Sequence, residues 1–189
     1  MDAIEFLRED HRKVLAMLDR LQAAPAARDG ASDELLEARK SLVTEIVIAE
    51  SQHEAVEEQY FWPMVRKEVP GGEGLAGPAV DQEAAAKYLL DALDKAAANQ
   101  SDFDEMVERL LHDGRKHIRY EQDEVWPEVR AAVGADRLGE VGEQMAAAKK
   151  KAPTRPHPGT PPAPAVQKIM GRAAGLIDRL RDGISGRGE

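Results

Sequence analysis

HEAVEEQYFWPMVRKEV occupies residues 53–69, and HIRYEQDEVWPEVRAAV occupies residues 117–133. When the two stretches are aligned at their first residue, the histidine, the glutamate four positions later, the Trp-Pro pair and two valines coincide. Both tryptophans of the chain, Trp62 and Trp126, lie at the same position of the repeat, and a proline follows each of them. This agreement indicates an internal duplication, which bears on the whole fold.

Each copy of the repeat carries a His-x-x-x-Glu pair, His53 with Glu57 and His117 with Glu121. Residues four apart lie one turn apart on the same face of an α-helix. An imidazole and a carboxylate can therefore bind one metal ion, and two such helices facing each other can form a dinuclear site. The alternative is a pair of duplicated amphipathic helices with incidental histidines. The matched Trp-Pro flanks favour the metal site.

The spacing of apolar residues predicts an all-α protein, an up-down antiparallel four-helix bundle with a short extra helix and an amphipathic C-terminal tail. The first helix is expected over about residues 3–21, with Asp2 and Glu5 as a capping box. The second begins after Ser32 and meets Pro63, which should kink or end it because proline lacks an N–H. The third is expected from Pro78 to about residue 98, and the fourth from about residue 101 to 133.

The first predicted helix has a single polar residue in its apolar stripe. Leu7, Val14 and Leu18 share a face with His11. A lone buried histidine is usually a core residue hydrogen-bonded to a neighbour. Because two further histidines are expected in the bundle interior, we interpret His11 as a metal ligand.

The composition excludes several classes of protein. The chain has 189 residues, a net charge of −9 and no cysteine, so disulfides, thiolate nucleophiles and zinc-finger sites are impossible. Residues 149–189 hold nine Lys/Arg and three Asp/Glu, and the acidic remainder argues against nucleic acid as a partner. The charged N-terminus has no signal-peptide core, no segment is apolar enough to span a membrane, and a cytoplasmic location is expected.

We divide the chain into four parts. Residues 1–135 form the predicted bundle, 136–151 a short helix, 152–164 a proline-rich linker and 165–189 a basic amphipathic tail. In the tail, Val166, Ile169, Ile177 and Leu180 share one face. Such a tail can dock on the bundle, bind a partner or contact an acidic membrane surface, and the sequence leaves these alternatives open.

The order His11, His53-x-x-x-Glu57, His117-x-x-x-Glu121 in a helical bundle resembles the hemerythrin-like (HHE cation-binding) family, including its bacterial members. The Asp-His near the N-terminus and the Trp-Pro after each pair resemble that family too, and the resemblance covers about residues 1–133. It implies a centre of two iron ions bridged by the two glutamates and an oxo or hydroxo ligand. His53 and Glu57, with His11, would then serve one iron, and His117 and Glu121 the other.

One family feature is missing, because the usual pattern has a further histidine on the third helix. This chain has no histidine between His53 and His112. If the first and third helices are also repeats, His11 aligns with Glu83, and a carboxylate is a competent iron ligand. Neighbouring Gln82 is the less favoured substitute, and a water molecule at a vacant position is the other alternative.

Three further polar residues, Glu54, Tyr60 and Tyr120, are expected beside the site, where hydrogen bonds to the ligands are their expected role. Direct phenolate ligation is a less favoured alternative. Trp62 is expected to pack against a neighbouring helix, and His112 to lie on another face of its helix.

The resemblance implies a protein that handles small molecules (oxygen, peroxide or nitric oxide) or senses iron. Because Glu83 replaces a neutral imidazole by a hard anion, ferric iron and catalase-like peroxide decomposition are favoured over oxygen carriage. A different hypothesis is a non-catalytic signalling or scaffold module in which the metal only staples the bundle. A zinc or manganese hydrolytic site is the third.

Overall fold

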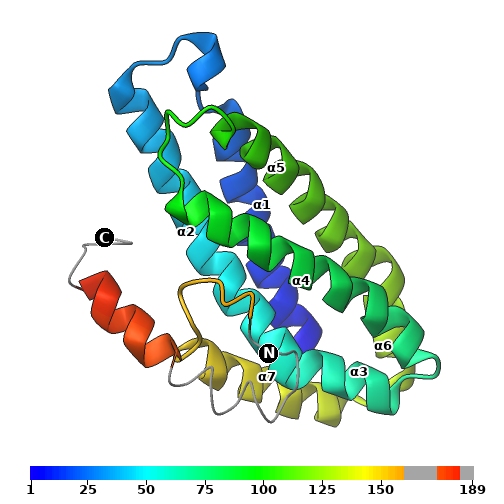
Figure 1. The fold of residues 1–189 in the computed structure, drawn as a ribbon. Helices are drawn as coiled ribbons and strands as arrows, with labels where there is room; N and C mark the ends of the chain where they lie inside the picture. Colours follow the sequence, from blue (N-terminus) through cyan, green and yellow to red (C-terminus); the bar gives the residue numbers. More distant parts are fainter. Residues whose placement is uncertain (160–173, 184–189) are drawn as a thin grey trace.

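The computed structural model describes residues 1–159 and 174–183, and this part of the chain is helical with no strand (Figure 1). Four long segments run up and down beside one another, as predicted, and α7 lies across one end of the bundle (Figure 1). The bounds of the elements are α1 Ala3–Ala23, η1 Ala27–Asp29, α2 Asp33–Val56, η2 Glu57–Phe61, α3 Trp62–Glu68, α4 Gly72–Lys95, α5 Phe103–Tyr120, η3 Glu121–Val125, α6 Trp126–Ala132 and α7 Ala135–Lys149.

The predicted start of the first helix is confirmed, whereas the predicted start of the third helix is wrong. Asp2 accepts from the Glu5 N–H at 2.9 Å and Glu5 accepts from the Asp2 N–H at 3.1 Å, which completes the capping box. The third long helix, α4, begins at Gly72 and contains Pro78. A Cβ at Gly72 would lie 2.0 Å from the Val65 carbonyl oxygen, so glycine lets α4 begin directly against α3.

A π-helical turn follows the His-x-x-x-Glu pair in each copy of the repeat. In η2 the Trp62 N–H donates to the Glu57 carbonyl, five residues back, and in η3 the Trp126 N–H donates to the Glu121 carbonyl. The wider turn places Glu and Trp, five residues apart, both in the buried interior. It also accommodates Pro63 in the first turn of α3, so the chain remains helical from α2 through η2 into α3.

The core consists of two apolar clusters with a polar layer between them. One cluster lies toward the end covered by α7 and includes Leu7, Trp62 and Trp126. The other lies toward the opposite end and includes Val14 and Leu90. Along the helices, the predicted ligands fall between the two clusters, so apolar side chains keep water away from both sides of the site.

The short helix α7 belongs to this core. Leu138, Val141 and Met145 are buried in the same cluster as Leu7. A Cβ at Gly142 would lie 2.6 Å from the Met1 carbonyl oxygen, so α7 crosses the start of the chain at close range. The bundle predicted to end at residue 135 thus buries apolar surface against the next helix as well.

Residues 174–183 form a helix that docks through its polar side. Asp178 is fully buried and accepts from the backbone N–H groups of Thr154 and Arg155, each at 3.2 Å. Ile177 and Leu180, from the predicted apolar face, are exposed. The rest of the predicted linker and tail, residues 160–173 and 184–189, lies outside the described residues. Within the described ranges, no helix combines the length and the apolar character needed to cross a bilayer.

Candidate metal centre

The structure brings six predicted ligands together in the middle of the bundle. They form two groups whose nitrogen or carboxylate oxygen atoms all lie within 4.8 Å of one another. Glu57 and Glu121 belong to both groups. The first group adds His11 and His53 to this shared pair, and the second adds Glu83 and His117.

The separations between these atoms suit a shared cation. His11 Nε2 lies 3.1 Å from Glu121 Oε2, His53 Nε2 lies 3.2 Å from Glu57 Oε2, and His117 Nε2 lies 3.0 Å from Glu121 Oε1. Ligands held at about 2.1 Å from one ion lie about 3 to 4 Å from each other. The two groups are therefore already arranged at ligand spacing.

The hydrogen bonding of the carboxylates points the same way. Both oxygens of Glu57, both of Glu121 and Oε2 of Glu83 are buried, and within the described part of the chain none of them accepts a well-formed hydrogen bond, although Glu57 and Glu121 have histidine nitrogens at 3.0 to 3.2 Å. A buried acceptor without a partner costs about 1–3 kcal/mol, and a charged one more. Metal ions would satisfy these oxygens, so the residues present fit a metal centre.

Burial and mutual repulsion control the charges of the cluster when no metal is bound. Burial and the nearby Glu121 raise the pKa of Glu57 well above its usual range. Burial also raises the pKa of Glu83, to about 8. Burial alone would lower the pKa of His117, but Glu121 outweighs it and raises this pKa to about 10. The same ion pair keeps the pKa of Glu121 low in spite of its burial.

These pKa values predict that metal binding releases at least two protons per chain near pH 7, and Glu57, whose pKa is also raised, adds to that number. With pKa values of about 10 and about 8, His117 and Glu83 both hold a proton at pH 7 in the metal-free protein and must lose it to ligate. Metal affinity should therefore rise as the pH rises and fall as it drops. Titration calorimetry in buffers of different ionisation enthalpy counts the protons. A count near zero would mean that neither side chain binds the metal.

The outer nitrogens of two histidines meet Asp10, which sequence reasoning did not assign to the site, and Gln82, which it gave only as a less favoured ligand. Asp10 Oδ2 lies 3.6 Å from His53 Nδ1, and Gln82 Oε1 lies 3.2 Å from His117 Nδ1. Burial would raise the pKa of Asp10, but His53 and Lys149 of α7 lower it to about 2. The alignment of His11 with Glu83 also places Asp10 on Gln82, so the repeat contained this signal. Gln82 thus contacts the ligand His117 through the outer nitrogen of its ring.

Each tryptophan of the repeat contacts a ligand on another long helix. Trp126 contacts His11 of α1, and Trp62 contacts Glu83 of α4. The Trp126 ring stacks on His11 with centroids 4.9 Å apart and an angle of 17°. The Trp62 indole N–H donates to Glu83 Oε1. Trp62 therefore does more than the expected packing. His11 and Glu83 occupy equivalent places in the two halves of the bundle, in agreement with the alignment of the first and third long helices.

Trp62→Phe is expected to lower the affinity for the ion beside Glu83 by about 10- to 100-fold, because losing a hydrogen-bond partner of a ligand has effects of this size. Trp126→Phe is the matched control, since its indole N–H makes no hydrogen bond among the described residues. Competitive metal titration of both variants measures the difference. Equal losses in the two would show that the rings act only through packing.

The other residues predicted beside the site have different surroundings. The Tyr120 hydroxyl donates to the Leu75 carbonyl at 3.0 Å and so fastens the start of α4. Tyr60 lines a small hollow against α7 with Gln144. Glu54 is buried near Glu83, and its Oε2 has no hydrogen-bond partner within the described chain. His112, which was expected to lie on another face of its helix, is exposed.

Comparison with known proteins decides the family. The family model described as the hemerythrin HHE cation binding domain matches residues 2–129. The chain belongs to this family. The HHE match spans the helices that carry all six residues of the two groups, so this is a metal-binding helical protein. The resemblance seen in the sequence is confirmed.

Two relatives agree with this assignment. An uncharacterized hemerythrin-like protein of Schizosaccharomyces pombe is 28% identical over 134 residues, which are 70% of this chain and 66% of the relative. The chain thus spans about two thirds of that relative's length. The crystal structure of an HHE cation binding domain-containing protein from Mycobacterium kansasii superposes with a TM-score of 0.66 and 20% identity, covering 94% of this chain and 99% of that one. At this identity the second likeness shows the shared fold.

Proposed function

We propose that this hemerythrin-like protein binds two iron ions and decomposes hydrogen peroxide. The observation that supports the proposal best is the sharing of Glu57 and Glu121 between the two groups of ligand atoms. A carboxylate that is within reach of two groups can bridge two ions, as in di-iron proteins built on helical bundles. His11 and His53 would complete one position, and His117 and Glu83 the other.

The chemistry of the donors supports iron as the metal. Imidazole and carboxylate suit iron, whereas cysteine ligands, which structural zinc sites commonly use, are absent from this chain. Three carboxylates, Glu57, Glu83 and Glu121, make the donor set hard and anionic, which favours the ferric state. Bound iron would supply the electron exchange by which two molecules of peroxide become oxygen and two of water.

The protein's own residues would prepare the site for this reaction. The apolar clusters on either side exclude bulk water and strengthen electrostatic interactions within the centre. Gln82 would orient His117 from hydrogen-bond distance of its outer nitrogen, and the Asp10 carboxylate, 3.6 Å from the outer nitrogen of His53, would favour that orientation of the ring electrostatically. The Trp62 N–H fixes Oε1 of Glu83 and leaves Oε2 available to a metal ion.

Metal analysis and peroxide assays of the full-length protein, purified from its native host, test the proposal. We expect about two iron ions per chain, ferric absorption and steady oxygen release from peroxide. The Glu57→Gln variant, at equal protein concentration, controls for free iron. Iron-loaded protein that leaves peroxide intact would overturn the catalytic proposal and favour the role of a metal-stapled module. Zinc or manganese in place of iron would overturn the assignment of the metal.

A further inference from the structure

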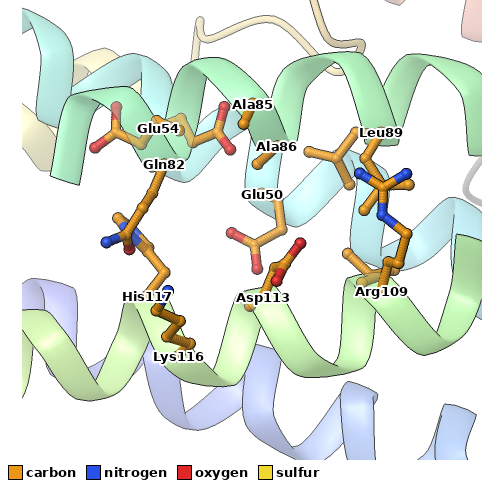
Figure 2. A pocket seen from close by; sticks show the side chains of 14 residues that line it. Glu50, Glu54, Gln82, Ala85, Ala86, Leu89, Arg109, Asp113, Lys116 and His117 are labelled. Atoms are coloured by element: carbon orange, nitrogen blue, oxygen red, sulfur yellow. The ribbon is translucent and has the colours of Figure 1, made fainter. Parts of the chain in front are cut away.

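A cavity of about 200 Å³ reaches the metal centre from the side of the bundle. It lies between α4 and α5, with α2 behind it (Figure 2). His117 and Glu83 of the centre form part of its wall. The cavity therefore connects the ligand groups with the protein surface.

The wall of the cavity carries acidic side chains at successive depths. Asp113 is exposed at the rim, Glu50 is half-buried, and Glu54 is buried beside Glu83. Figure 2 shows the carboxylates of Glu50 and Asp113 facing the same space between α4 and α5. The acidic groups thus lead from solvent to the ligands.

These carboxylates make few contacts with hydrogen-bond donors within the described part of the chain. Glu54 is only 4% exposed, and its Oε2 makes no hydrogen bond within the described part of the chain. Among the described residues, Glu50 and Asp113 make no hydrogen bond or salt bridge either, although His117 and Lys149 act on Glu50 electrostatically. Carboxylate oxygens that make no hydrogen bond within the protein are hard donors that suit a cation. The occupant that this wall favours is a cation.

Of the two basic residues of the cavity, Arg109 lies at the end away from His117 and Lys116 lies beside His117 (Figure 2). Lys116 and Arg109 are exposed, and long basic side chains keep their charged ends in water. Arg109 extends from α5 toward α4 at the end of the cavity farthest from His117 (Figure 2). Cations are therefore repelled from that end, and the acidic wall leads toward His117 and Glu83.

We propose that this cavity is the entrance through which Fe²⁺ reaches the metal centre, with Asp113, Glu50 and Glu54 as successive carboxylate contacts. The proposal rests on iron being the metal, as proposed above, and is independent of the peroxide reaction. By microscopic reversibility, the ion leaves by the same route. Release from the loaded protein therefore reports on the entrance.

The test uses the iron-loaded full-length protein, reduced under anaerobic conditions and mixed with an excess of a coloured ferrous chelator. Ala86 lines the cavity, so Ala86→Phe should obstruct it, and exposed Ala84, which does not line it, gives the control Ala84→Phe. Glu50→Gln removes a charge from the wall, with Glu105→Gln as its exposed control outside the cavity. We expect Ala86→Phe and Glu50→Gln each to slow iron release by about tenfold, and the controls to match the wild type.

Equal iron content and equal helical circular dichroism in all variants would show that the metal centre itself is intact. If the larger ring of Ala86→Phe prevents folding, Ala86→Leu takes its place. Unchanged release in both cavity variants would overturn the proposal. So would slower peroxide decay with unchanged iron release, because the cavity would then serve the small molecule alone. Iron content and peroxide decay of the wild type test the proposed function separately, since the release rates compare variants that are loaded to the same level.

Discussion

Glu57→Gln and Glu121→Gln are each expected to empty both metal positions, whereas His53→Ala should empty mainly one. The two glutamates belong to both groups of ligand atoms, and His53 belongs to one. Glutamine keeps the size of the side chain but removes the anionic oxygen that a hard cation needs. The loss of affinity should exceed the roughly 10- to 100-fold effect of an outer hydrogen-bond partner. Metal analysis after gel filtration measures the ions retained per chain.

The Glu57→Gln substitution should not destabilise the metal-free protein. Burial and the other carboxylates raise the pKa of Glu57, so its charged form is disfavoured in the folded state. For an acid with a raised folded pKa, stability is lost as the pH rises above the unfolded value, and this penalty is present at pH 7. Metal-free Glu57→Gln should thus melt at or above metal-free wild type. Retention of one full ion by this variant would show that Glu57 serves a single position.

Glu83→His is expected to slow peroxide decay by about tenfold or more and to make the iron easier to reduce. Glu83 occupies the place that His11 has in the other half of the bundle. Exchanging its anion for a neutral imidazole raises the net charge of a buried site by one, and charge counts for more where the dielectric constant is low. Ferrous iron is then favoured, with about 60 mV for each tenfold change in relative affinity.

Glu83→Gln is the matched control, because it makes the same change in charge without supplying an imidazole. A redox titration gives the potential, and an oxygen electrode gives peroxide decay. Both variants should rise in potential, and only Glu83→His should keep two ions bound. A Glu83→His protein with wild-type potential and wild-type peroxide decay would contradict the idea that this carboxylate selects the reaction.

The predicted ligands came from local pattern, and the residues that sequence reasoning missed are those whose roles depend on another helix. His53 and Glu57 share a face because helix geometry fixes residues four apart. Whether Asp10 meets His53, or Gln82 meets His117, depends on how two helices are rotated against each other. Side-chain packing along the whole interface sets that rotation. The repeat aligns Asp10 with Gln82 and so could have indicated that the two are equivalent. It could not show that Asp10 lies beside His53 or that Gln82 lies beside His117.

The turns after each ligand pair illustrate the same limit. The sequence predicted a disturbance at Pro63, because a missing N–H is a local property. Only the fold turned it into a π turn, since burying both Glu57 and Trp62 requires one wider turn between them. The early start of α4 has a similar origin. It depends on how closely Gly72 approaches Val65 of α3.

The sequence by itself determined the helical class, the periodic placement of the histidines and glutamates and the equivalence of His11 with Glu83, because helix periodicity and duplication are written in residue order. The tertiary structure decided that Glu57 and Glu121 lie within reach of both groups, that Trp62 donates to Glu83, that α7 completes the core and that an acid-lined cavity reaches the centre. Each of these depends on distances between helices. Such distances follow from the packing of many side chains at once, which no single stretch of the chain encodes.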